Sequence, residues 1–274
     1  MNHSTGFTGR ALTIAGSDSG GGAGIQADLK TFQELGAYGM SALTAATAQN
    51  TLGVQGVYPL AKEAVAAQIH SVGSDIGVDA LKTGMLFSAD IIETVAEAIA
   101  FFGWTKVVVD PVMIAKGGAS LLQDEAVRAM TEKLLPLTAV VTPNIPEAER
   151  LTGVSIRSRA DKIEAAKRLA GFGARNVIIK GGHEDGGEAV DLLFDGSSVT
   201  EMSGKRIETA RTHGTGCTYS AALTAGLAQG MGMEEAARRA KAFIQAAIED
   251  GIVIGSGHGP TNHWAYRRKF TSVF

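Results

Sequence analysis

Residues 80–113 read ALKTGMLFSADIIETVAEAIAFFGWTKVVVDPVM, in which two short β-prone runs flank a longer segment with helical spacing. The first run lies near 80–82, the helical segment spans about 89–101, and the second run is Val107–Val109. Short apolar strands separated by amphipathic helices are typical of a parallel sheet that is covered on both faces. This stretch therefore predicts an α/β fold.

The same alternation runs from residue 11 onward. Further strands are predicted at 12–14, 42–44, 139–141 and 177–179, and further helices at about 25–35 and 62–72. Asp195-Gly196, between Leu192-Leu193-Phe194 and Val199, is typical of a hairpin turn. We therefore expect an antiparallel edge late in a mostly parallel sheet, and this hairpin argues against a closed eight-stranded barrel.

Length and composition favour one globular unit. The chain has 274 residues, of which 45% are hydrophobic and 19% charged, and it contains 35 glycines for tight turns. Open α/β folds reach this size as a single domain. We place one domain over residues 10–266, with an N-terminal tail at 1–9 and a C-terminal tail at 267–274.

Charge and cysteine content exclude several classes of protein. A net charge of −3 provides no general attraction for nucleic acid or anionic lipid. No apolar run approaches the ~20 residues that cross a bilayer, and residues 1–9 lack the apolar core of a signal peptide. A single cysteine excludes an intrachain disulfide, and the scattered histidines show no zinc spacing. We expect a cytoplasmic protein that uses at most a hard cation brought by phosphate and carboxylates.

The stretch Thr212-His213-Gly214-Thr215-Gly216-Cys217 places the only cysteine where a glycine-rich turn becomes a helix. The free backbone N–H groups of a helix start attract phosphate, and the same field lowers the pKa of a nearby thiol below its usual ~8.5. We expect a partly ionised Cys217 beside a phosphate site. The alternative is a small apolar cysteine in a helix that needs glycines only for its turn.

Polar residues and glycines follow one predicted strand after another. Ligands of open α/β sheets bind beyond the carboxyl ends of the strands, so this edge is predicted to be a binding site. The residues concerned are Gly16 to Gly24, Gln49-Asn50, Thr83-Gly84-Met85, Asp110-Pro111-Val112-Met113, Thr142 to Glu147 and Lys180 to His183.

Several of these residues have a plain structural interpretation. Asp110 could cap a turn, and Asn144 with Glu147 has the spacing of a helix cap, with Pro146 in the first turn. The alternative for Asp110 and Glu147 is a Mg²⁺ site. Lys116 and Lys180 could neutralise phosphate or merely be solvated. Met85 and Met113 are more typical of the core than of a ligand contact, although both lie at this edge.

Two familiar nucleotide-binding motifs are incomplete in this sequence. Gly22-Ala23-Gly24-Ile25-Gln26-Ala27 matches the dinucleotide fingerprint, but no acid lies between Glu34 and Glu63 to hold a ribose. The only Gly-Lys dipeptide is Gly204-Lys205, which lacks the upstream glycine of a Walker A loop. If a nucleoside triphosphate binds, the turn Gly214-Thr215-Gly216 must hold the transferred phosphate.

Taken together, these motifs resemble the hydroxymethylpyrimidine/phosphomethylpyrimidine kinases of thiamine biosynthesis, which are members of the ribokinase-like superfamily. The resemblance covers nearly the whole chain. It rests on Ala15 to Asp18, Gly21 to Lys30, Ala48 to Thr51, Lys82 to Leu86, Asp110 to Met113, Thr142 to Ala148, Lys180 to His183 and Thr212 to Cys217. It implies a three-layer αβα sandwich that binds MgATP and a small pyrimidine, and we also expect a homodimer.

The resemblance also implies roles for single residues. Gly214, Thr215 and Gly216 would form the anion hole, and Cys217 would take the position of a catalytic acid found in many relatives. Asp110 and Glu147 would organise Mg²⁺. Residues matching the family's pyrimidine contacts are Gly16, Ala23, Asp28, Gln49, Met85 and Val112, with Gln49 and Asp28 on the ring substituents; Lys180, Asn144 and Lys116 fall on the nucleotide side.

The predicted activity is transfer of the ATP γ-phosphoryl group to 4-amino-5-hydroxymethyl-2-methylpyrimidine and then to its monophosphate. A pyridoxal or pyridoxine kinase of the same superfamily is the alternative, since both substrates are planar rings with a hydroxymethyl arm. An NAD-dependent oxidoreductase would need the missing ribose acid. A non-catalytic pyrimidine sensor would bind the ring but release no ADP.

Overall fold

The computed structural model describes residues 8–113, 123–182 and 187–270, and over these ranges nine strands form a single sheet. The strand order is β3-β2-β1-β4-β5-β6-β7-β8-β9. The strands are β1 (Arg10–Asp18), β2 (Tyr38–Asn50), β3 (Gly53–Pro59), β4 (Ala80–Thr83), β5 (Val107–Val109), β6 (Val140–Val141), β7 (Asn176–Ile179), β8 (Glu188–Phe194) and β9 (Val199–Lys205).

The sheet is parallel in its centre and antiparallel at both edges. Strands β2, β1, β4, β5, β6 and β7 pair in parallel, whereas β8 and β9 form the expected hairpin at the late edge. At the other edge β3 pairs antiparallel to β2, and we did not predict this strand. Gln49, expected just after the second strand, therefore lies inside the long strand β2.

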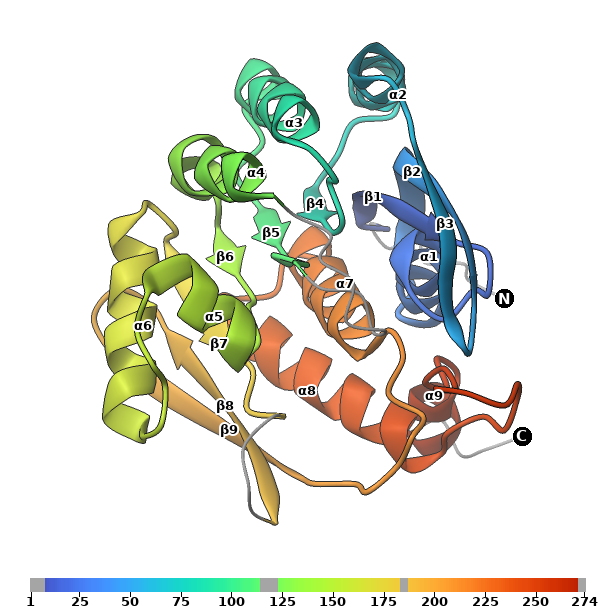
Figure 1. Ribbon diagram of the computed structural model, residues 1–274, viewed down its shortest axis with the longest axis vertical. Coiled ribbons are helices and arrows are strands. Elements are labelled where there is room, and N and C mark those ends of the chain that lie inside the picture. Colours follow the sequence, from blue (N-terminus) through green and yellow to red (C-terminus); the bar gives the residue numbers. More distant parts are fainter. Residues whose placement is uncertain (1–7, 114–122, 183–186, 271–274) are drawn as a thin grey trace, which may run out of the picture.

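Helices cover both faces of the sheet (Figure 1), which confirms the three-layer αβα architecture. One face carries α2, α3, α4, α5 and α6, and the other carries α1, α7 and α8. The helices are α1 (Gly24–Glu34), α2 (Lys62–Asp75), α3 (Ala89–Phe102), α4 (Asp124–Ala129), α5 (Ile145–Thr152), α6 (Arg159–Gly171), α7 (Thr215–Ala228), α8 (Met233–Glu249) and α9 (Ala265–Phe270). A π-helical turn (Met130–Leu134) and a 3₁₀ turn (Leu135–Leu137) follow α4.

The two cores arise from the alternation of side chains along the buried strands. In β5, Val107 and Val109 belong to the core under α2 to α6, while Val108 belongs to the core under α7 and α8. All three are fully buried, and burial of such a side chain stabilises the fold by about 1.5–3 kcal/mol. A run of three valines is therefore what a two-sided strand requires.

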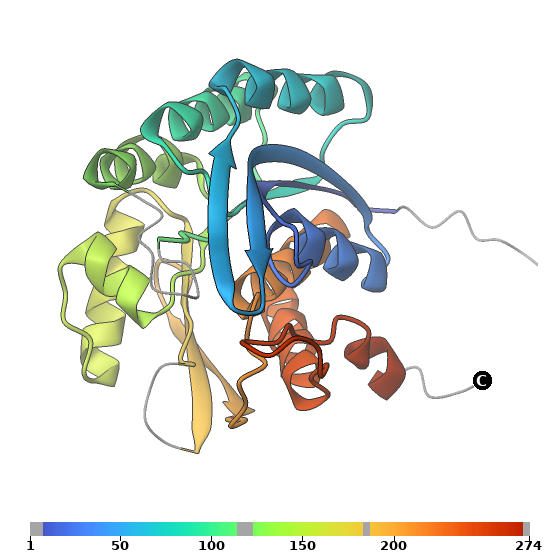
Figure 2. The same cartoon turned by 45° about the vertical axis from the view of Figure 1, so that its right-hand side comes forward.

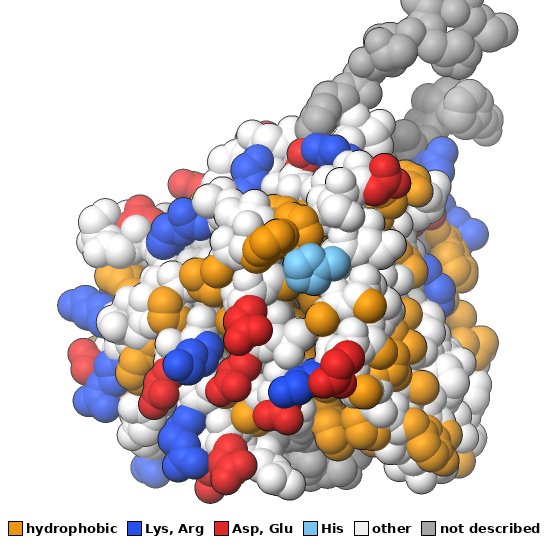
Figure 3. Space-filling view, turned by 90° about the horizontal axis from the view of Figure 1, so that it is seen from above, with side chains coloured by type: hydrophobic (Ala, Val, Ile, Leu, Met, Phe, Trp, Pro, Cys, Tyr) orange, Lys and Arg blue, Asp and Glu red, His pale blue; other side chains and the backbone are white. Residues whose placement is uncertain are grey.

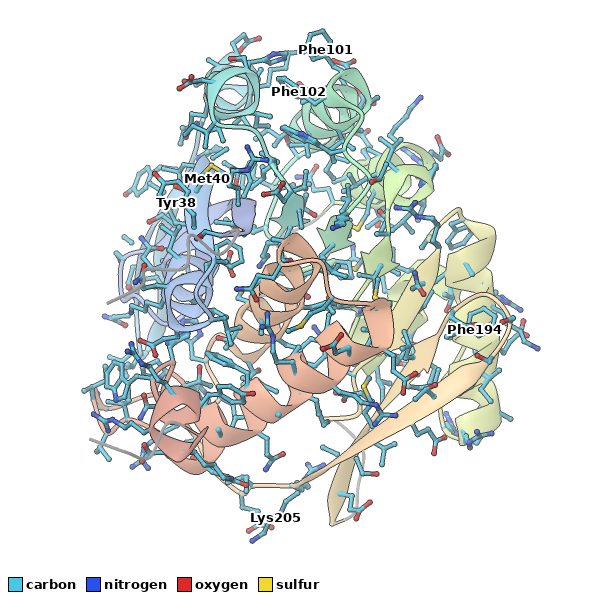
Figure 4. All side chains as sticks on the ribbon, turned by 180° about the vertical axis from the view of Figure 1, so that it is seen from behind. Tyr38, Met40, Phe101, Phe102, Phe194 and Lys205 are labelled. Atoms are coloured by element: carbon cyan, nitrogen blue, oxygen red, sulfur yellow. The ribbon has the colours of Figure 1, made fainter. Side chains whose placement is uncertain are left out.

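Helix α3 illustrates how the local sequence sets its ends. The Ser88 hydroxyl accepts the N–H of Ile91 and caps the first turn, and Gly103 ends the helix with φ 65°. At its C-terminal end the rings of Phe102 and Trp104 stack at 4.6 Å, and His70 of α2 lies 5.2 Å from Phe102. Figure 4 labels Phe101 and Phe102 at this end, and Phe101 is 73% exposed.

The β2–β3 hairpin lies beside the C-terminal segment, as Figure 2 shows. The N–H of His258 donates to the Thr51 carbonyl at 2.8 Å, and the N–H of Gly257 donates to the Thr51 hydroxyl at 3.3 Å. Helix α9 (Ala265–Phe270) crosses residue 266, where we placed the end of the domain.

The surface seen in Figure 3 carries acidic and basic side chains side by side, with no block of a single sign. This fits the low net charge. Within the described ranges, no helix has both the length and the apolar character needed to cross a membrane.

Candidate active site

A cavity of about 520 Å³ opens at the carboxyl ends of the parallel strands. The chain leaves β1 for β2 on one side and reaches β4 on the other, so the cavity lies at the point where the strand order reverses, the usual ligand position in open α/β sheets. The predicted site residues that line it are Gly16, Ala23, Gln49, Met85, Asp110, Val112, Asn144, Glu147, Lys180, Gly214, Thr215, Gly216 and Cys217. Asp28 does not line it, and Lys116 lies outside the described residues.

Apolar residues form part of the cavity wall. A Cβ atom at Gly16 would lie 2.4 Å from the Met85 methyl carbon, so only glycine lets the thioether lie against the end of β1. Val54 and Val57 of the unexpected strand β3 contribute to the lining. The β-branched and aromatic residues that follow Gly53 are the sequence signal that would have revealed this strand.

Gln49 is held at both its backbone and its side chain. Its N–H donates to the Ser19 hydroxyl at 2.8 Å, and that hydroxyl donates to the Gln49 carbonyl at 2.7 Å. Its amide Oε1 lies 3.1 Å from the Thr47 hydroxyl, and its amide Nε2 lies 3.3 Å from Nε2 of His213. An amide fixed in this way can recognise the edge of a planar heterocycle.

The assignment of Asp28 to the substrate ring was wrong. Asp28 is fully buried behind the cavity, where it accepts hydrogen bonds from Lys82 Nζ at 2.9 Å and from the Thr13 hydroxyl at 2.6 Å. Burial alone would lower the pKa of Lys82, but the Asp28 carboxylate raises it above its ordinary value. Asp28 and Lys82 thus form a buried ion pair, with Asp28 on the sheet-facing side of α1.

The turn before α7 depends on a close backbone contact. Gly214 has φ 78°, and a Cβ atom there would lie 1.8 Å from the carbonyl oxygen of Gly22. Only glycine therefore lets this turn dock against the first glycine loop. The first-turn N–H groups of α7 have no carbonyl partner within the helix and line the cavity, so they form a site suited to phosphate.

Cys217 lies in the first turn of α7, but the expected thiolate is wrong. Burial raises the pKa of the Cys217 thiol to about 11, although the Lys82 cation and the N–H of Gly24, which bonds the sulfur, both favour ionisation. Partial removal from water therefore outweighs the field of the helix start, and the free thiol is protonated at neutral pH.

Asp110 and Lys180 form the charged end of the cavity. Lys180 Nζ lies 3.0 Å from Asp110 Oδ1, and the Ser220 hydroxyl donates to Asp110 Oδ2 at 3.4 Å. Burial would lower the pKa of Lys180, whereas Asp110 and Glu147 raise it. A lysine that stays cationic beside the turn can neutralise a phosphate.

Asn144 and Glu147 do form the helix cap that their spacing predicts. The Asn144 side chain accepts the N–H of Glu147 at 2.9 Å, and the Glu147 carboxylate accepts the N–H of Asn144 at 2.8 Å. Both nevertheless line the cavity. Burial and the nearby Asp110 raise the pKa of Glu147 to about 7, against the opposing effect of Lys180.

Burial is the main cause of this raised pKa and repulsion from Asp110 adds to it, so a cation beside the two carboxylates would be favoured. Among the described residues there is no cluster of three or more His, Cys, Asp or Glu side chains that would hold a metal alone. The donor set therefore fits a Mg²⁺ ion that takes one or two carboxylates and fills its other positions with phosphate and water.

Two residues of the quoted motifs have roles that the sequence did not reveal. Asp18 is 2% exposed and accepts the N–H groups of Gly20, Gly22 and Ala23 at 2.8–3.0 Å. His213 lies with Nε2 2.8 Å from Asp18 Oδ2, although the two are far apart in sequence. Two features of the sequence could have indicated these roles. Asp18 is followed by the glycines of the first loop, and His213 directly precedes the phosphate turn.

Comparisons with known proteins agree with this geometry. A family model described as phosphomethylpyrimidine kinase matches residues 18–262. A hydroxymethylpyrimidine/phosphomethylpyrimidine kinase from Bacillus subtilis is 57% identical over 260 residues, covering 94% of this chain and 96% of the relative. A thiamine biosynthesis bifunctional protein from Geobacter sulfurreducens is 54% identical over 255 residues, covering 93% of this chain and 52% of that longer protein.

A solved structure extends the comparison to the fold. The pyridoxal kinase from Staphylococcus aureus in complex with AMP-PCP and pyridoxal superimposes with a TM-score of 0.89 at 41% identity, covering 96% of both chains.

Proposed function

Since the chain belongs to the phosphomethylpyrimidine kinase family, we propose that it transfers the γ-phosphoryl group of ATP first to the hydroxymethyl arm of 4-amino-5-hydroxymethyl-2-methylpyrimidine and then to the resulting monophosphate. One observation carries the proposal. A ring-sized pocket with the Gln49 amide and a charged end with Lys180 belong to one cavity, and the turn 214–217 lines it too.

The first transfer forms a bond between the arm oxygen and the γ-phosphorus and breaks the bond from that phosphorus to the β-γ bridging oxygen. ADP leaves, and the hydroxyl proton passes to a base. Such transfers depend mainly on positioning and on stabilisation of charge. The amides of Gly214, Thr215 and Gly216 stabilise the charge on the transferred group, and Lys180 neutralises phosphate beside them.

In this proposal Asp110 and Glu147 would hold the Mg²⁺ ion that accompanies ATP. When bound, the ion screens the charge of the phosphates. The pKa of Glu147 would fall with a cation bound beside it, because the cation would oppose the repulsion from Asp110.

The second transfer uses the same turn but a different acceptor. A phosphate monoester has its second pKa at ~6 and is mostly ionised at neutral pH, so this step needs no base. The minor thiolate form of Cys217 in the first turn of α7 is the base that we propose for the arm's proton in the first step. The two transfers therefore share the anion hole and differ in their need for Cys217.

Pyridoxal phosphorylation is the second candidate, because the 41% identical Staphylococcus aureus protein is named a pyridoxal kinase. Gln49 favours the pyrimidine, since its amide matches a ring nitrogen next to an exocyclic amine. The test is a parallel measurement of kcat/KM for both compounds with MgATP, with Gln49→Leu as the matched variant. We expect the pyrimidine to be preferred and the variant to lose about 1–3 kcal/mol for it; a preference for pyridoxal would overturn the proposal.

The expected homodimer and the cytoplasmic location stay predictions, and sedimentation velocity would test the first of them.

A further inference from the structure

His213 lies between the acid of the first glycine loop and the amide that faces the substrate. Its Nε2 is 2.8 Å from Asp18 Oδ2 and 3.3 Å from the nearer end of the Gln49 amide. His213 and Asp18 are both buried, so water does not compete strongly for these hydrogen bonds. One ring nitrogen thus serves two partners.

The Asp18 carboxylate determines that Nε2 of His213 carries a proton. Burial would raise the pKa of Asp18, but the hydrogen bonds from His213 and from the N–H groups of Ala23 and Gly20 bring it below its ordinary value. Asp18 is therefore an ionised carboxylate, which can only accept hydrogen bonds. Nε2 of His213 must carry a hydrogen and donate it.

This proton determines the orientation of the Gln49 amide. The nitrogen and oxygen ends of an amide are distinguished by their hydrogen bonds. As placed, the Gln49 NH₂ group faces Nε2 of His213 and sets one donor against another, so the amide is turned by 180° and its carbonyl oxygen belongs there. The NH₂ end then faces Thr47, whose hydroxyl already donates to the Ser17 carbonyl at 2.7 Å and can accept from the amide.

The amide then has one N–H and one oxygen lone pair left for a ligand. An aminopyrimidine pairs with both, because its ring nitrogen accepts and its amine donates. The 4-oxo compound of the same shape presents the reverse pattern, a ring N–H beside a carbonyl. Only an amide that is free to rotate by 180° could pair with both compounds equally well.

We propose that Asp18 and His213 are positioning residues that hold the Gln49 amide in one orientation and thereby make the site select an amino-substituted pyrimidine over its oxo counterpart. The inference rests on the proposed function, because it assumes that a pyrimidine lies against Gln49. It extends that function by naming what sets the choice of ring substituent.

The experiment compares 4-amino-5-hydroxymethyl-2-methylpyrimidine with its 4-oxo analogue. For each protein, kcat/KM with MgATP and Kd by calorimetry give a ratio of amino to oxo compound. Native protein should favour the amino compound by at least about tenfold, which corresponds to roughly one mispaired buried hydrogen bond. Gln49→Leu, which has no amide, gives the ratio expected without this contact.

The variants separate a positioning role from a structural one. His213→Leu removes the donor and should lower the ratio about tenfold or more, toward that of Gln49→Leu. His213→Gln restores an N–H at the position of Nε2 and should keep the native ratio. Thr47→Val removes the partner of the other amide end and should lower the ratio even if His213→Leu does not fold.

Each outcome has a definite meaning. A native ratio in both His213→Leu and Thr47→Val would overturn the inference and leave the proposed function intact. A ratio in His213→Gln as low as in His213→Leu would overturn the assignment of the donor. Native protein that binds neither pyrimidine would overturn the proposed function itself, and the inference with it.

Discussion

Replacing Cys217 with alanine separates the two phosphoryl transfers. The pKa of the thiol is raised to about 11, so roughly one molecule in 10⁴ is a thiolate at pH 7. A base that must be deprotonated gains activity as the pH rises toward its pKa. The alcohol step should therefore accelerate about tenfold per pH unit from pH 7 to 9, while the monophosphate step stays nearly flat, because its acceptor already ionises at ~6.

A positioned base contributes up to roughly 10²–10⁴-fold when it is deprotonated, so the loss in Cys217→Ala should be small near pH 7, grow as the pH rises, and flatten the pH profile of the alcohol step. Single-turnover reactions with each acceptor, quenched and resolved by mass, give the two rates. Thr215→Ala is the control, since it changes a side chain of the same turn and keeps every amide. Equal losses in both steps would show that Cys217 only shapes the anion hole, and no loss in either would make it a packing residue.

Three further predictions concern charge. Asp110→Asn and Glu147→Gln should each raise the Mg²⁺ concentration for half-maximal rate several-fold, and titration curves that overlay the native one would make both residues purely structural. Lys82→Met leaves Asp28 buried without its partner and should cost about 3–5 kcal/mol in urea unfolding, with part regained in Lys82→Met/Asp28→Asn; native stability in the single variant would contradict a charged pair. Burial lowers the pKa of His263, which bonds the Thr218 hydroxyl at 3.1 Å, to about 4. Because the unfolded value is ~6.5, stability should fall as the pH drops from 6.5 toward 4, and less steeply in His263→Asn; identical melting profiles across this range would refute it.

The central sheet and the phosphate turn were predictable because their signals are local. Three consecutive valines, Val107–Val109, place apolar side chains on both faces of a strand and so predict burial on both sides. The residues Gly214 to Cys217 predict the start of a helix without reference to any distant segment. Strand β3 was missed because it lies at the edge of the sheet. An edge strand is only partly buried, so the apolar pattern in its sequence is weak. Its position beside the cavity follows from pairing with β2.

The errors at the site concern contacts between distant segments. Nothing local to Asp28 shows that it faces Lys82, which is 54 residues away, instead of the cavity. The ionisation of Cys217 was misjudged for the same reason. A helix start favours a thiolate, but neighbouring segments partly shield the Cys217 sulfur from water, and this shielding has the larger effect on its pKa.

The central claim is that one site carries out two successive transfers to the same arm. Its most direct test is a time course with 4-amino-5-hydroxymethyl-2-methylpyrimidine and excess MgATP, in which alcohol, monophosphate, diphosphate and ADP are resolved by mass. The monophosphate should rise first and then fall as the diphosphate accumulates, with two ADP formed for each diphosphate. A reaction that stops at the monophosphate, or that leaves the pyrimidine unchanged while pyridoxal is phosphorylated, would contradict the account.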